Sequence, residues 1–106
     1  MSELTDKQKR FPLMVAQLII FAYSKGYQLV FSYWFRCKDC PVGEKNSLHK
    51  KCLAIDLELF KGPKYLQKTE DHRELGEFWE SLDPENSWGG HFKDGNHYSI
   101  IYKNMR

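Results

Sequence analysis

Histidine and aspartate residues occur at two places in the chain with a spacing that suits a metal site. His49 and Asp56 lie seven residues apart in SLHKKCLAIDL, and His97 closes the segment DGNH. Two imidazoles and one carboxylate are a recurring ligand set for catalytic zinc, which keeps its fourth coordination position for water. These three residues are therefore the candidate ligands of one Zn²⁺ ion.

Two further residues have the chemistry that a hydrolytic zinc site needs. Asp94 lies three residues before His97, and a tight turn through Gly95 would bring its carboxylate to the site as general acid and base. Arg36 offers a planar set of donors for a substrate carboxylate or a developing oxyanion. These residues also have ordinary interpretations. Asp94 fits a plain turn, and Arg36, like the candidate ligand His49, fits a solvated surface.

Asp56 lies in the middle of an apolar run, where an uncompensated carboxylate costs roughly 2 kcal/mol or more. The strand predicted at 52–60 puts leucine and isoleucine on one face, and Cys52, Ala54 and Asp56 on the other. The ordinary interpretation is a strand with one face in water. A metal ion beside the small Ala54 would instead neutralise the carboxylate.

Two more predicted strands divide their faces in the same way. The strand at 27–36 sets a large apolar face, which includes Phe31, opposite Arg36. The strand HYSIIYK sets its tyrosines on one face and His97 on the other. If the three strands form one antiparallel sheet with helices on the apolar side, Arg36, Asp56 and His97 converge on the opposite side.

Two amphipathic helices are predicted to cover the apolar side. The first, at about 5–25, repeats apolar residues at helical spacing, and the second carries an i, i+3, i+4, i+7 stripe that begins at Leu75. The segment DPENSWGGHFKDGN between the second helix and the last strand is expected to be a functional loop. The predicted fold class is α+β, a small antiparallel sheet with the helices packed on one face.

The composition indicates one domain spanning residues 1–106, with a single modest core. The net charge of +2 comes from scattered residues, so no nucleic-acid partner is expected. Three cysteines exclude a complete set of disulfides and favour a reducing cytosol. The apolar stretch of the first helix lacks a signal-peptide pattern and is short for a bilayer, so no stable membrane association is expected.

The chain resembles a known family of zinc peptidases over about residues 36–102. SLHKKCLAIDL is similar to the S-x-H-(x)6-D signature of that family, and DGNHYSI is similar to its closing acid-x-x-H element. LGEFWESL and WGGHF resemble the segment between these elements in small phage and prophage members. Those members are L-alanyl-D-glutamate endopeptidases that serve as endolysins.

The resemblance implies a fold shared with D-alanyl-D-alanine carboxypeptidases and the Hedgehog signalling domain. Carried over by position, it implies zinc ligation by His49, Asp56 and His97, acid-base catalysis by Asp94, and substrate contacts from Arg36 and Ser47. The implied substrates are the stem peptides of bacterial peptidoglycan. The L-Ala-D-Glu bond is favoured, and a D-alanyl-D-alanine carboxypeptidase or dipeptidase is the alternative. A monomer held in the cytoplasm until its release to the cell wall is also implied.

A structural zinc knuckle is an alternative from another class of function. Four residues have the spacing C-x2-C-x8-H-x2-C, namely Cys37, Cys40, His49 and Cys52. Such a module would bind nucleic acid or a partner protein without catalysis, and it would leave both aspartates and His97 unexplained. A domain that keeps the peptidase fold but only binds partners is a third possibility.

Two other histidines and one cysteine are open in their roles. His72 and His91 are expected at the surface, although His91 lies in the predicted loop and could approach the cleft. Cys52 stands where many members of the family carry glycine, three residues after the first histidine.

Overall fold

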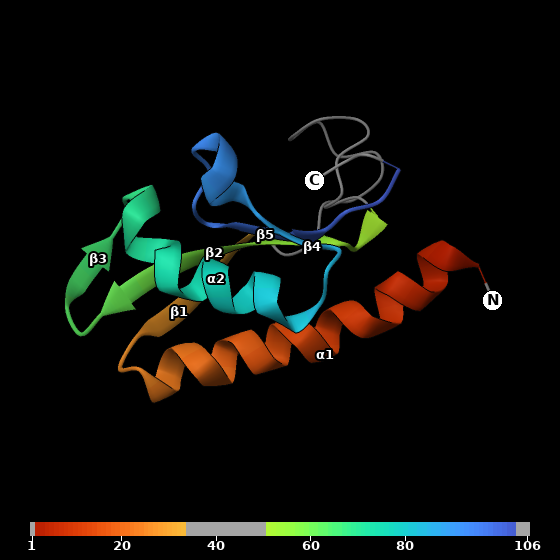
Figure 1. The fold of residues 1–106 in the computed structure, drawn as a ribbon. Helices are drawn as coiled ribbons and strands as arrows, with labels where there is room; N and C mark the ends of the chain where they lie inside the picture. The colour runs from red at the N-terminus through yellow and green to blue at the C-terminus, as the bar shows by residue number, and fades with distance from the viewer. Residues whose placement is uncertain (1, 34–50, 104–106) are drawn as a thin grey trace.

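The computed structural model describes residues 2–33 and 51–103, which form an α+β fold (Figure 1). The element order is α1 (Glu3–Ser24), β1 (Gln28–Tyr33), β2 (Ala54–Lys61), β3 (Lys64–Leu66), the 3-10 helix η2 (Thr69–His72), α2 (Arg73–Leu82), β4 (Asn86–Trp88), the 3-10 helix η3 (Gly89–Phe92) and β5 (His97–Ile100). The predicted α+β class with a small antiparallel sheet is therefore confirmed.

The sheet is organised around β2. Its strand order is β1-β2-β5-β4, all neighbours are antiparallel, and β3 also pairs with β2. The register between β2 and β5 sets Ile55 opposite Tyr98, and that between β4 and β5 sets Trp88 opposite Tyr98. Because side chains alternate between faces, these three residues share one side of the sheet.

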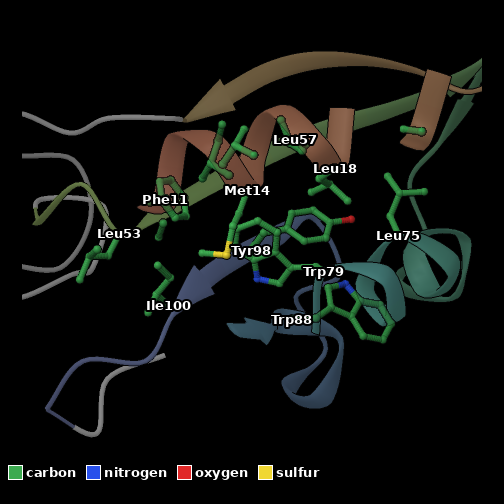
Figure 2. Packing of buried hydrophobic residues seen from close by; sticks show 14 of the residues in the cluster. Phe11, Met14, Leu18, Leu53, Leu57, Leu75, Trp79, Trp88, Tyr98 and Ile100 are labelled. Carbon is green, nitrogen blue, oxygen red and sulfur yellow. The ribbon is translucent and has the colours of Figure 1, made fainter. Parts of the chain in front are cut away.

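Both α-helices of the described residues pack on that side of the sheet (Figure 1). Figure 2 shows the rings at the centre of the core, where Trp79 of α2 meets Phe11 of α1 edge to face at 5.7 Å and Tyr98 of β5 at 6.1 Å. Burial of a large apolar side chain stabilises a fold by about 1.5–3 kcal/mol. The fully buried members include Leu18, Leu53, Leu57, Leu59, Leu75, Trp79, Tyr98 and Ile100.

Helix α1 has clear sequence signals at both ends. The Ser2 hydroxyl caps it by accepting a hydrogen bond from the Thr5 N–H at 3.2 Å, and Gly26 follows its end with a positive φ of 89°. Four residues of its predicted apolar stripe are buried, namely Phe11, Met14, Val15 and Leu18, whereas Phe21 is half-buried. Within residues 2–33 and 51–103, no helix is long and apolar enough to cross a membrane.

Phe31 lies on the predicted core face, opposite the buried Leu57, but its side chain is 57% exposed. The expectation that Phe31 is a buried core residue is therefore wrong. Strand β1 lies at the edge of the sheet, and its pairing with β2 becomes irregular between Phe31 and Tyr33. An apolar groove of about 280 Å³ separates Phe31 from α1 and is also lined by Phe11, Val15 and Ile55. The helix therefore covers the start of β1 better than its end.

The segment 83–96 is not the long loop that the sequence predicts, because it contains β4 and η3. The Trp88 indole N–H donates to the Gly95 carbonyl at 2.7 Å. Its ring also lies against α2, where a Cβ added at Gly76 would be 2.1 Å from the Trp88 ring. Burial of this indole, which is 3% exposed, thus fastens the segment to the second helix.

His72 is buried rather than at the surface, which corrects the sequence expectation. It is 2% exposed, and its Nδ1 lies 2.8 Å from the Tyr98 hydroxyl oxygen. Burial lowers the pKa of His72 to about 4, although the carboxylates of Asp71 and Glu58 act in the opposite direction. Burial also raises the pKa of Tyr98, so that its hydroxyl keeps a proton that it can donate to the neutral imidazole.

We expect His72 to make the stability of the protein fall in mild acid. The unfolded chain binds a proton at this residue near pH 6.5, whereas the folded chain does so only near pH 4. Stability is therefore complete above about pH 7 and decreases as the pH falls through this window, by roughly 2 kcal/mol at about pH 5. Urea unfolding of wild type and His72→Gln at both pH values measures this difference.

The matched variant Tyr98→Phe keeps the buried histidine and should therefore keep the decrease in acid. Equal pH dependence of wild type and His72→Gln would contradict the prediction.

Candidate metal centre

The register between β2 and β5 places Asp56 directly opposite His97. The Asp56 Oδ1 and His97 Nδ1 atoms are 3.1 Å apart, and both residues are 8% exposed. They lie on the face that the helices do not cover, as the alternation of β2 predicts. A carboxylate in contact with an imidazole offsets part of the cost of burying each group.

The surroundings of this pair are buried. Ala54 and Ser99, which are cross-strand partners on the same face, are both 0% exposed. The ordinary interpretation of β2 as a strand with one face in water is therefore wrong at this end of the strand. Because the local dielectric is low, the interaction between Asp56 and His97 is stronger than at a solvated surface.

The geometry of the pair is compatible with two corners of a tetrahedral zinc site. Zinc bonds to nitrogen and oxygen of about 2.0–2.1 Å place neighbouring ligand atoms about 3.3 Å apart. The observed 3.1 Å between Oδ1 and Nδ1 is close to this value, and it also suits a hydrogen bond. Asp56 and His97 could therefore hold a metal ion with these two atoms as ligands.

Several predicted site residues lie outside the described residues and stay predictions: Arg36, Cys37, Cys40, Ser47 and His49. His49 is the third predicted zinc ligand. Among the residues that the structure does describe, no group of three or more His, Cys, Asp or Glu side chains could hold a metal ion.

Asp94 begins the turn that leads into β5. Its carbonyl accepts a hydrogen bond from the His97 N–H at 3.1 Å, and its own N–H donates to the Gly89 carbonyl at 2.8 Å. A Cβ added at Gly95 would lie 2.6 Å from the Thr69 Cα, so the turn passes too close to η2 for a larger residue. Asp94, the candidate general base, is exposed, while the hydrogen bond between its carbonyl and the His97 N–H fixes its backbone relative to His97.

His91 helps to hold η3 on α2. Its Nε2 lies 2.9 Å from both carboxylate oxygens of Glu80, and one of these oxygens also accepts a hydrogen bond from the Trp88 N–H at 3.0 Å. The imidazole also meets the Trp88 ring edge to face. The sequence left the role of His91 open. In the structure, His91 contacts Glu80 and Trp88, which lie outside the Asp56–His97 pair.

Phe92 is a residue near the candidate centre that the sequence interpretation missed. Its ring lies 6.1 Å from the His97 ring, between centroids, and the side chain is 45% exposed. An exposed aromatic ring at this place can contact an apolar part of a substrate. It lies in a four-residue 3-10 helix, where periodicity gives no signal for it.

Cys52 has a left-handed backbone with a φ of 58°. Such a conformation costs an L-residue about 1–2 kcal/mol relative to glycine. The prediction that Cys52 shares the face of Asp56 is wrong, because Cys52 lines the apolar groove beside Phe11 and Ile55. It precedes the start of β2 at Ala54, so the alternation of the strand does not extend to it.

The sequence matches no model of a known protein family, and no curated protein is significantly similar to it. The sequence motifs and the geometry of the described residues are therefore the basis for a functional proposal.

We expect the protein to bind one zinc ion in a manner that needs both Asp56 and His97. Loss of a group that only hydrogen-bonds to a metal ligand weakens metal binding by about 10–100-fold, so Asp56→Asn and His97→Gln should each exceed that loss. Zinc content after equilibrium dialysis, together with the rise in melting temperature on adding Zn²⁺, measures the effect. Glu77→Gln on the exposed side of α2 is the control and should bind zinc like wild type. Wild-type zinc affinity in Asp56→Asn or His97→Gln would refute the site.

Proposed function

We propose that this chain is a zinc-dependent peptidoglycan hydrolase that cleaves an amide bond of the stem peptide. The observation that carries the proposal is the buried contact between Asp56 and His97, with Asp94 three residues before His97 on a fixed turn. These residues belong to the motifs that resemble those of the zinc peptidase family. On this proposal, the α+β fold is the one shared by D-alanyl-D-alanine peptidases and the Hedgehog domain.

His49, Asp56 and His97 are the proposed ligands of the metal. When bound, a zinc ion supplies Lewis-acid chemistry, because it acidifies a water molecule and polarises the substrate carbonyl. The burial of Asp56 and His97 and their positions on paired strands favour a rigid ligand geometry.

Asp94 is the proposed general acid and base. Its carboxylate would take a proton from the attacking water and deliver it to the leaving amine as the carbon–nitrogen bond breaks. The net reaction adds one water across the amide and needs no other reactant. Arg36 and Ser47 are proposed to bind the substrate, with the Arg36 guanidinium paired to a substrate carboxylate.

The L-Ala-D-Glu bond is the proposed point of cleavage, because the quoted motifs are most similar to those of endolysin members of the family. A carboxypeptidase or dipeptidase would need the same metal ligands and the same base. Mass spectrometry of digested peptidoglycan separates these activities, since each leaves a different new terminus.

We expect Asp94→Asn to lower peptidoglycan hydrolysis by about 10²–10⁴-fold, because general acid-base catalysis contributes that much. Zinc content should stay at the wild-type level, since Asp94 is not a proposed ligand. Release of new amino termini from purified peptidoglycan gives the rate. Glu77→Gln on the exposed side of α2 is the control and should keep full activity, while undiminished hydrolysis by Asp94→Asn would contradict the mechanism.

The zinc-knuckle alternative makes an opposite prediction for the cysteines. Cys52 lines the groove on the helix side of the sheet, whereas Asp56 and His97 occupy the other side. We therefore expect Cys37→Ser combined with Cys40→Ser to retain both zinc and hydrolysis. Loss of the zinc from this double variant, measured by the same dialysis, would favour the knuckle instead.

A further inference from the structure

A polar pocket of about 270 Å³ lies between β2, β3 and the turn that carries Asp94. It is lined by charges of both signs, with Glu58 and Asp94 as the carboxylates and Lys93 as the cation, and by the hydroxyl-bearing Tyr65. This volume is near the lower end of ligand pockets and suits one amino-acid side chain. Glu58 follows Asp56 by two residues on the same face of β2, so the pocket adjoins the candidate metal centre.

The negative side of this pocket is held in place. The Tyr65 hydroxyl donates a hydrogen bond to the Glu58 carboxylate, and the Tyr65 ring stacks on Phe60 with 4.8 Å between centroids. The hydrogen bond to Glu58 raises the pKa of Tyr65, so that the phenol remains a donor. The other lone pairs of the carboxylate can accept hydrogen bonds from an ammonium group.

Lys93 supplies the positive charge from an unusual backbone position. It follows η3 with a left-handed φ of 63°, a conformation in which glycine or asparagine is the common residue. Such a conformation costs lysine roughly 1 kcal/mol or more. Sparsely populated backbone conformations of this kind cluster at ligand-binding sites, and this one lies directly before Asp94.

A second polar hollow lies between α1 and Glu85, and its basic side chains are already paired with carboxylates. There, the Lys7 and Arg10 side chains already form ion pairs with Glu85, at 3.0 Å and 3.3 Å. Those pairs tie the helix to the sheet. That hollow therefore carries no comparable argument for a ligand.

We propose that the pocket of Glu58, Tyr65 and Lys93 binds a zwitterionic amino-acid end of the substrate. Glu58 and the Tyr65 oxygen receive its ammonium, and Lys93 receives its carboxylate. This inference rests on the proposed function, since the pocket then lies beside the amide that is cut. In stem peptides, a third residue of diaminopimelate carries both charges at the end of its side chain, whereas lysine carries the ammonium alone.

Two substrates that differ only at this residue test the inference, namely L-Ala-γ-D-Glu-meso-diaminopimelate and L-Ala-γ-D-Glu-L-Lys. The wild-type zinc enzyme should cut the first with a kcat/KM about tenfold higher, as expected for one charge-assisted hydrogen bond. Lys93→Gln should lower the rate on the diaminopimelate peptide by about tenfold and so abolish the preference between the two peptides. Glu58→Gln should slow both, because both carry the ammonium.

Lys64→Gln is the matched control, since Lys64 is an exposed lysine of β3 that does not line the pocket. It should keep the wild-type preference. Melting temperature and zinc content of each variant separate a loss of recognition from a loss of folding. Equal wild-type rates on the two peptides, or an equal loss on both in Lys93→Gln, would overturn the inference.

Binding distinguishes this inference from the proposed function. If the zinc-loaded protein cuts neither peptide, amide chemical shifts are followed while each intact peptide is added. Shifts at Tyr65 and Lys93 that are larger with the diaminopimelate peptide would support the pocket and reject only the hydrolase. Hydrolysis of both peptides without any preference would reject the pocket and leave the hydrolase standing.

Discussion

The contact between Asp56 and His97 is the constraint on which the rest of the structure depends. Two polar side chains are buried together on the far side of a sheet whose near side is the hydrophobic core. A register shift of one residue in β2 would turn Asp56 into that core and its leucines outward. The apolar alternation of β2 and the contact of Asp56 with His97 therefore specify the same register. A shift by one residue would lose both the burial of the leucines and this contact.

The position of His97 depends in turn on the segment before it. Trp88 fits against Gly76 of α2, Glu80 contacts both His91 and the Trp88 N–H, and the turn at Gly95 lies against η2. These contacts are made by neighbours of the centre and not by the candidate ligands themselves. Packing of α2 on β4 is thus connected to the geometry of the site through the backbone.

The sequence predicts those parts of the structure that have long periodic patterns. The stripes of α1 and α2 and the alternation of β2 extend over many residues, and they place Asp56 and His97 on one face. Strand β4 has only three residues, too few for any period, and Cys52 breaks the alternation with a left-handed φ. Phe31 looks like a core residue because pattern alone does not reveal how far a helix covers an edge strand. The burial of His72 depends on a tertiary contact with Tyr98, which no local pattern contains.

Strand β2 is paired along both of its edges, with β1 on one edge and with β5 and β3 on the other. Its amide protons can exchange with solvent only when several ladders open together, which makes such openings rare. Asp94, by contrast, is exposed, and its own N–H makes a single hydrogen bond, to the Gly89 carbonyl, outside the strand ladders. Hydrogen exchange would thus divide the centre into a slow half that bears the strand carboxylate and a faster half that bears the turn carboxylate.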